Sequence, residues 1–99
     1  MTTPMKLSAD EIQTQLETLS GWKLLSGGVA IEKTFTFKDF DEAWSFMSTV
    51  AVLAKELNHH PEWKNTWNTV EITLSTHDVG GISDLDMMLA KKMDTLILK

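Results

Sequence analysis

The chain has 99 residues, of which 42% are apolar and 23% charged, and its formal net charge is -5. This composition fits one folded domain over residues 1–99, and the acidic balance argues against nucleic acid as a ligand, because phosphate binding requires a basic face. Cysteine is absent, which excludes disulfides, thiolate catalysis and zinc-thiolate sites. We expect a soluble cytoplasmic protein, because the chain start lacks the apolar run of a signal peptide and no stretch is apolar enough to span a membrane.

The first third of the chain predicts a short helix followed by a β-hairpin. Ser8 can cap a helix, and Glu11 stands three residues later, as a capping box requires, so we expect a helix over residues 9–19. The turn signal Ser-Gly-Gly then separates two extended runs, residues 22–25 and 29–37. The apolar residues on one face of the second run, interrupted by Lys33, are Val29, Ile31, Phe35 and Phe37.

The longest predicted helix begins after Asp39, a good N-cap with Glu42 three positions later. It must end before Pro61, because a residue that precedes proline avoids the helical region. Residues at helical spacing form a wide apolar stripe, for which core packing is the ordinary explanation. The stripe comprises Phe40, Ala43, Trp44, Met47, Val50, Ala51, Ala54 and Leu57.

The last third predicts two strands and a helix. Residues 63–67 and 70–76 read as a second hairpin, and in the latter run apolar and polar residues alternate, as in a half-buried strand. Ser83 caps the final helix, with Asp84 and Asp86 in its first turn. Its predicted buried side comprises Leu85, Leu89, Met93 and Leu96. The order αββαββα predicts an α+β fold with a four-stranded antiparallel sheet and three helices packed on one face.

The three histidines are the candidate chemical groups. His59 and His60 precede one strand of the second hairpin, and His77 follows the other, so the hairpin can bring all three to one rim. If the extended backbone continues past residue 76, His77 projects from the polar face of the sheet. Pro61 restricts His60, and imidazole can both donate and accept protons near neutral pH. This pattern indicates proton transfer.

Other interpretations of these residues remain open at this point. A histidine is most often a surface or core residue, and three histidines can also bind zinc, although adjacent residues of an extended chain point to opposite sides. Trp63 and Trp67 share strand parity and could stack on a flat heterocycle, or pack in the core or at an oligomer interface. Gly80 and Gly81 are interpreted as turn residues, because the spacing of a phosphate loop is missing.

Together, the motifs "NHHPEW" and "VEITLSTHDVGGISDLD" resemble those of the pterin-4a-carbinolamine dehydratase family. The resemblance extends from the "GW" at Gly21 and Trp22 through the final helix. It implies a dehydratase without a cofactor or metal that removes water from 4a-hydroxytetrahydropterin, the product of aromatic amino-acid hydroxylases, and yields quinonoid dihydropterin. It also implies a four-stranded antiparallel sheet with helices on one face, and assembly into homodimers or homotetramers.

The same resemblance implies the site residues. The catalytic histidines of the family fall on His59, His60 and His77, which also bind the substrate. The other substrate-binding positions fall on Pro61, Thr76, Asp78 and Asp86. Where family members often carry an acidic residue four positions before the first histidine, this chain has Lys55, and Glu56 follows it.

The chemistry of such a reaction suits histidine independently of the family. Eliminating hydroxide from a carbinolamine requires an acid at the leaving oxygen and a base at a ring N–H, while the electrons of the ring nitrogen expel the oxygen. We assign the acid and base roles to His60 and His77, and substrate binding with charge stabilisation to His59. Which of His60 and His77 is the acid stays open.

A second hypothesis is a protein that acts only by binding a partner. Animal members of the resembled family also bind the helical dimerisation domain of a transcription factor. The acidic charge of this chain is compatible with a protein partner. Pterin turnover separates the two hypotheses, because a protein that only binds a partner leaves it unchanged.

Overall fold

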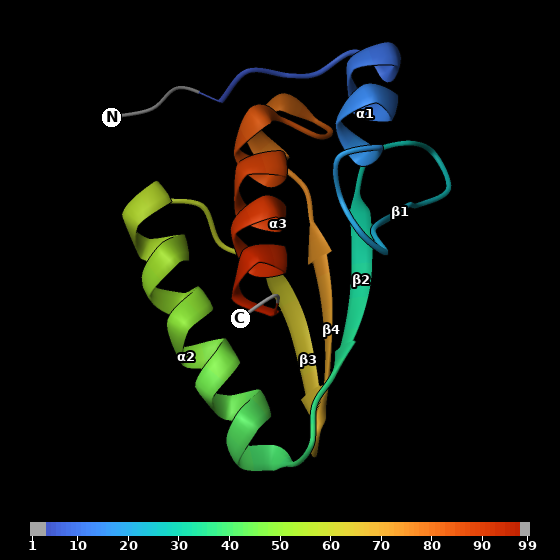
Figure 1. Ribbon diagram of the computed structural model, residues 1–99. Helices are drawn as coiled ribbons and strands as arrows, with labels where there is room; N and C mark the ends of the chain where they lie inside the picture. The colour runs from blue at the N-terminus through green and yellow to red at the C-terminus, as the bar shows by residue number, and fades with distance from the viewer. Residues whose placement is uncertain (1–3, 98–99) are drawn as a thin grey trace.

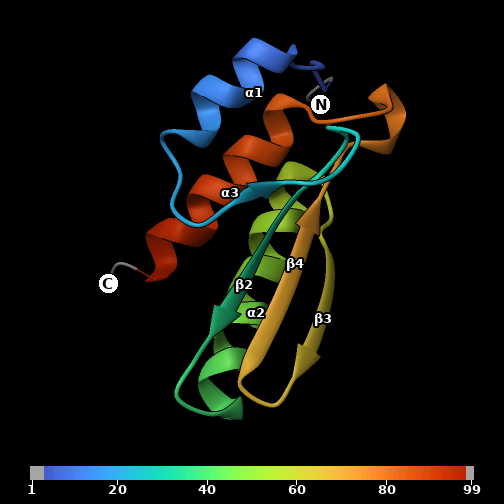
Figure 2. The same cartoon turned by 90° about the vertical axis from the view of Figure 1, so that its right-hand side faces the viewer.

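The computed structural model describes residues 4–97, which form a four-stranded antiparallel sheet with helices on one face, as predicted. Figures 1 and 2 show α2 and α3 on the same face of the sheet, with α1 at one end. The strands lie in the order β1-β2-β4-β3. The elements are α1 Ala9–Leu16, β1 Lys23–Leu24, β2 Ile31–Thr36, α2 Phe40–Leu57, β3 Glu62–Thr66, β4 Thr69–Leu74, the 3-10 helix η1 His77–Val79, and α3 Asp84–Ile97.

Strand β4 is the centre of the sheet and of the core. It pairs with β2 on one side and β3 on the other, with Ile72 opposite both Lys33 and Trp63. Val70, Ile72 and Leu74 point toward the helices and are almost completely buried, while Glu71 on the other face is exposed. The predicted half-buried strand is therefore confirmed. Each such side chain contributes about 2 kcal/mol by leaving water.

Helix α2 was predicted correctly in length but not in orientation. Ala43, Met47, Val50 and Ala54 are buried as expected. Phe40, Trp44 and Ala51 were predicted to belong to the buried stripe, and this was wrong, because all three are exposed. The buried arc of the helix is instead turned toward Phe46, which packs against Phe35 and Phe37. The apolar residues left outside are Phe40, Trp44, Ala51 and Val52.

The interruption of the apolar face of β2 by Lys33 has a structural explanation. Its ammonium donates to Oδ1 of Asp94 on α3 at 2.7 Å and to the carbonyl oxygen of Ser20 at 2.5 Å. The nitrogen also lies 4.6 Å from the ring centroid of Phe35. The indole N–H of Trp22 donates to the same Asp94 oxygen. The lysine thus connects β2, α3 and the segment after α1 under partial burial.

Several predicted boundaries were too long. Helix α1 ends at Leu16, three residues early, and β1 contains only Lys23–Leu24. The second hairpin turns at Trp67, whose φ of 48° is left-handed, so this tryptophan is exposed and does not share a strand face with Trp63. The prediction that Trp63 and Trp67 share a strand face is therefore wrong. No helix within residues 4–97 is long and apolar enough to cross a membrane.

Candidate active site

The end of α2 separates the two adjacent histidines into different environments. Asn58 closes the helix in a left-handed conformation, with φ 52°, and the backbone N–H of His59 donates to the carbonyl of Ala54 at 2.9 Å. His60 precedes Pro61, which disfavours the helical conformation at that residue, and β3 begins at Glu62. The side chain of His59 is buried, whereas that of His60 is exposed.

The carboxylate of Asp86 is the centre of the buried part of the site. Its Oδ1 lies 2.5 Å from Nε2 of His59. Its Oδ2 accepts the hydroxyl of Thr76 at 2.8 Å and the backbone N–H of Ser83 at 2.9 Å. Asp86 is fully buried, so it is placed to orient His59 and Thr76, and a substrate in solvent does not reach it directly.

Local sequence explains why a carboxylate sits there. Ser83 precedes α3, and its Oγ accepts the backbone N–H of Leu85, while Asp86 reaches back to the N–H of Ser83. The carboxylate of Asp86, the third residue of α3, reaches back to the cap as in a capping box, while Ser83 Oγ accepts the N–H of the second residue, Leu85. The positive end of the helix dipole stabilises the negative charge. The predicted cap at Ser83 is confirmed, and the same two residues also form part of the site.

The exit from β4 differs from the prediction. The strand ends at Leu74, and Thr76 and Gly81 form an isolated bridge in which the N–H of Thr76 donates to the carbonyl of Gly81 at 2.7 Å. Between them, His77 begins a 3-10 helix that Gly80 closes with φ 67°. The expectation that His77 continues the extended strand is therefore wrong. His77 and Asp78 are nevertheless exposed on this short loop.

The three histidines are brought to one end of the sheet by this geometry. His59 and Thr76 bind the same carboxylate, and His60 and His77 are the next residues along the chain from each. The register agrees, because Glu62 near the start of β3 lies opposite Thr73 near the end of β4. The site thus combines a buried imidazole-carboxylate pair with exposed imidazoles on the two adjoining residues. Pro61, half buried, stands between His60 and β3.

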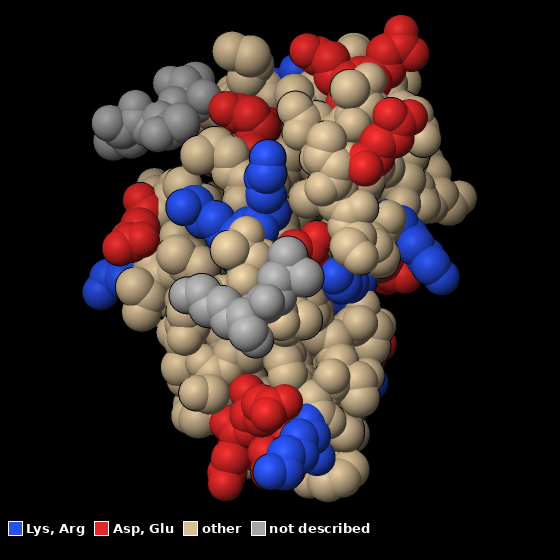
Figure 3. Space-filling view, viewed as in Figure 1, with Lys and Arg blue, Asp and Glu red and all other residues tan. Residues whose placement is uncertain are grey.

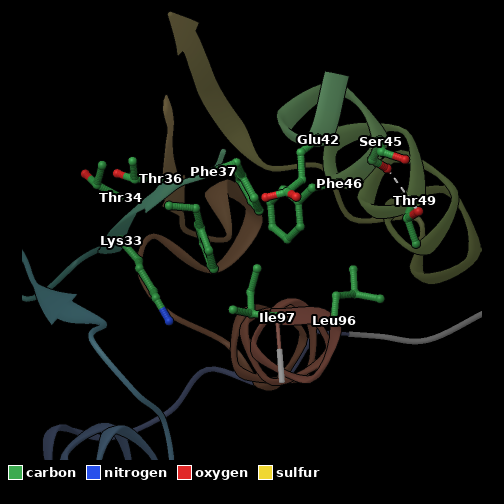
Figure 4. Close-up of a pocket in the computed structure, with 11 residues that line it drawn as sticks. Lys33, Thr34, Thr36, Phe37, Glu42, Ser45, Phe46, Thr49, Leu96 and Ile97 are labelled. Atoms are coloured by element: carbon green, nitrogen blue, oxygen red, sulfur yellow. Dashed lines mark hydrogen bonds between the residues drawn. The ribbon is translucent and has the colours of Figure 1, made fainter. Parts of the chain in front are cut away.

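A cavity of ≈ 560 Å³ lies elsewhere, between β2, the first half of α2 and the last turn of α3. Figure 4 shows Phe37, Phe46 and Leu96 in its wall. No histidine lines it. Leu96 is ten residues along α3 from Asp86, about 15 Å. The cavity is therefore separate from the histidine site.

Three histidines can form a zinc site. Within residues 4–97 no group of three histidine, aspartate or glutamate side chains is arranged to hold a metal ion. Nε2 of His59 is occupied by Asp86, and the side chain of His60 is exposed. Lys55 and Glu56, at the end of α2, are both exposed.

A family model described as "Pterin 4 alpha carbinolamine dehydratase" matches residues 5–96. The chain belongs to this family. Its members are hydro-lyases, and the resemblance inferred from the histidine motifs is confirmed. The resemblance also implied a four-stranded antiparallel sheet with helices on one face, and this is the arrangement found.

Relatives in this dehydratase family are close in sequence. A protein of a Bradyrhizobium strain is 50% identical over 91 residues, covering 92% of this chain and 91% of its own. One from Sinorhizobium fredii is 52% identical over 91 residues, covering 92% and 87%. The names of both contain "pterin-4-alpha-carbinolamine dehydratase".

Solved structures agree with the family fold. A crystal structure of a "transcriptional coactivator/pterin dehydratase" from Brucella melitensis has a TM-score of 0.90 and 41% identity, covering 93% of this chain and 98% of its own. A pterin dehydratase-like protein described as a RuBisCO assembly factor in the alpha-carboxysome has a TM-score of 0.67 at 23% identity, which shows the shared fold alone.

Sequence reasoning missed Ser83 as a member of the site. It also did not foresee that Thr76 and Asp86 bind each other and His59. The signal for the first was present, since "SDLD" has the spacing of a capping box that points a carboxylate back along the chain. Nothing local in the sequence connects Asp86 to His59, 27 positions away.

Proposed function

We propose that the protein dehydrates 4a-hydroxytetrahydropterin to quinonoid dihydropterin by histidine acid–base catalysis. The single observation that carries the proposal is the buried carboxylate of Asp86, which binds His59 and Thr76, the residues next in the chain to the exposed His60 and His77. Membership of the dehydratase family supplies the substrate class. The product is the form that returns the pterin cofactor of aromatic amino-acid hydroxylases to use.

The reaction requires two proton transfers and no redox change. The bond between C4a and the hydroxyl oxygen breaks, a ring nitrogen loses its proton, and the nitrogen lone pair forms a C=N bond, so that water leaves. An acid at the oxygen and a base at the nitrogen are each typically worth about 10² to 10⁴ in rate. Because the nitrogen electrons expel the oxygen, the proposed mechanism uses no cofactor and no metal.

The roles follow from exposure and contacts. His60 and His77 are exposed and carry the two proton transfers. His59, fixed by Asp86, binds the pterin and stabilises charge. Pro61 and Asp78 stand at the open side of the site and contact the substrate.

The buried residues support this arrangement from beneath. Thr76 and Asp86 are almost fully covered, so their part in substrate binding is exerted through His59. At the position where family members often carry a carboxylate this chain has Lys55, and both Lys55 and the neighbouring Glu56 are exposed.

A direct assay tests the proposal. 4a-Hydroxytetrahydropterin is generated in a stopped-flow instrument, and its decay is followed with and without the protein. We expect catalytic amounts of the protein to accelerate decay well above the spontaneous rate, with quinonoid dihydropterin as the product. An unchanged decay rate in the presence of folded protein contradicts the proposed activity.

We also infer a homodimer or homotetramer in the cytoplasm. Two surfaces support assembly. Strand β1 covers only Ile31 and Glu32 of β2, so the β2 edge over residues 33–36 has no neighbouring strand within residues 4–97. Open edges of this kind favour pairing with another strand. The second surface is the exposed apolar stripe of α2, where Phe40 and Trp44 stack with ring centroids 6.2 Å apart.

The exposed stripe of α2 also favours a second candidate function, binding of a helical protein partner. The Brucella relative is described as a transcriptional coactivator as well as a dehydratase. If partner binding were the sole function, the wild-type protein would not accelerate pterin turnover. Changes at Phe40 and Trp44 would then abolish partner binding. The decay assay above therefore separates the two candidates.

Direct nucleic-acid binding is not part of the proposal. Figure 3 shows acidic side chains gathered over α1 and near the start of α2, with lysines scattered between them. The net charge of -5 opposes phosphate binding.

A further inference from the structure

The hydroxyl groups of Ser83 and Thr76 lie in a chain of hydrogen bonds that ends at Asp86. Oγ of Ser83 lies 2.6 Å from Oγ1 of Thr76, and Oγ1 of Thr76 lies 2.8 Å from Oδ2 of Asp86. Both residues and the carboxylate are buried. The positions of the hydroxyl protons follow from what each partner is able to donate.

The direction of the chain is determined by its two ends. The backbone N–H of Leu85 can only donate, and it donates to Oγ of Ser83 at 3.2 Å. An ionised carboxylate can only accept, so the single hydroxyl proton of Thr76 is donated to Asp86. The remaining contact then requires Ser83 to donate to Thr76. Every proton in the chain therefore points toward Asp86.

The same carboxylate fixes the proton on His59. An ionised carboxylate only accepts, so in the contact between Nε2 of His59 and Oδ1 of Asp86 the proton resides on Nε2. The opposite tautomer would place the Nε2 lone pair 2.5 Å from a carboxylate oxygen whose neighbouring oxygen already receives two other protons. The neutral ring is thereby held with Nδ1 unprotonated.

Nδ1 of His59 opens toward solvent. Within residues 4–97 every buried side-chain nitrogen and oxygen has a hydrogen-bond partner, and Nδ1 has no partner in that range. Nδ1 is thus one of the exposed atoms of a side chain that retains 10% of its surface. In the Nε2–H tautomer it is an acceptor whose lone pair is unused within residues 4–97.

We propose that Ser83 and Thr76 are positioning residues which, through Asp86, lock His59 in the Nε2–H tautomer and make Nδ1 an obligatory acceptor for an N–H group of the ligand. The inference rests on the proposed function for the identity of that ligand, a pterin, whose ring carries several N–H donors. A ligand that presents a carbonyl or another acceptor at this point is disfavoured, because two lone pairs would then face each other.

The experiment is a long-range ¹H–¹⁵N correlation spectrum of the intact protein labelled with ¹⁵N-histidine, recorded without any pterin. We expect His59 to show a protonated Nε2 and an unprotonated Nδ1. In Asp86→Asn, Ser83 and Thr76 still donate toward the position of Oδ2 and hold the amide oxygen there, so the NH2 group faces His59. The tautomer should then invert to Nδ1–H, and KM should rise about tenfold for the loss of one substrate hydrogen bond.

Variants of the chain test the two hydroxyls. In Thr76→Val we expect a mixture of the two His59 tautomers and a higher KM, with a smaller change in kcat. Thr76→Ser retains the hydroxyl, so its tautomer and its KM should be those of the wild type. Ser83→Ala should shift the His59 signals in the same direction as Thr76→Val, by a smaller amount. A protonated Nδ1 in the neutral wild-type ring overturns the proposal, as does retention of Nε2–H in folded Asp86→Asn. Because the spectrum needs no substrate, failure of the dehydratase assay leaves this result intact, and the reverse also holds.

Discussion

Asp86 joins His59, 27 positions earlier in the chain, to the start of α3, because one carboxylate oxygen faces the imidazole and the other completes the helix cap with Ser83. A single buried side chain thus couples the stability of a helix to the orientation of a site residue. This coupling means that changes at Asp86 affect both folding and ligand binding.

Replacing Asp86 with alanine should lower the free energy of unfolding by about 3 kcal/mol, because it leaves the buried partners His59, Thr76 and the Ser83 N–H without an acceptor. Urea denaturation followed by circular dichroism measures the change. Asp78→Ala is the matched control, because Asp78 is exposed and should change stability by less than about 0.5 kcal/mol. Equal stability of the two variants would show that the buried network is not stabilising.

His60→Ala and His77→Ala should each lower kcat by roughly 10² or more, the effect of one lost acid or base. His59→Ala should mainly raise KM. The double variant of His60 and His77 should lose less than the product of the single losses, because the two act as a unit. Steady-state kinetics of folded variants measures this, with Ser48→Ala on the exposed side of α2 as the control. Near wild-type kcat in both single variants would remove these histidines from proton transfer.

Activity should survive metal chelation. The reason is that the proposed elimination is driven by the ring nitrogen, and that Nε2 of His59 is taken by Asp86. Dehydratase rates before and after treatment with a chelator, together with metal analysis of the active protein, measure this. Stoichiometric zinc in active protein, with activity lost to the chelator and restored by zinc, contradicts the mechanism.

The protein should form a homodimer or homotetramer, seen by light scattering as a multiple of 11.2 kDa at micromolar concentration. Trp44→Lys should reduce the measured mass, because it places a charge in the exposed apolar stripe of α2. Gln13→Lys, on the exposed side of α1, is the control and should leave the mass unchanged. An 11 kDa monomer for the wild type would show that the open edge of β2 and the α2 stripe do not mediate self-association.

The sequence predicted the order of helices and strands well, because caps and periodicity are local signals. The cap at Asp39 is present, with the N–H of Glu42 donating to its side chain at 2.9 Å. The orientation of α2 was missed because Trp44 and Phe46 are both apolar, and only the tertiary packing of Phe46 against Phe35 decides which one is buried. Periodicity alone does not distinguish an apolar residue in the core from one at a surface.

The residues of the site were predicted better than their arrangement in space. The histidines and Pro61 were visible in the sequence, but the backbone path at His77 depends on the closure between Thr76 and Gly81, which the extended parity of β4 did not predict. The buried bonds of Asp86 join α3 to residues before and after the second hairpin. Such long-range hydrogen bonds have no periodic signature, so the family resemblance was the only pointer to Asp86.

The decay of 4a-hydroxytetrahydropterin, measured by stopped flow with wild-type protein and with the His60→Ala, His77→Ala double variant, tests the central claim most directly. We predict fast, catalytic decay with the wild type and a rate reduced by roughly 10² or more with the folded double variant. Decay that is equally fast with both proteins, or that the wild type does not accelerate, would contradict the claim that these histidines catalyse pterin dehydration.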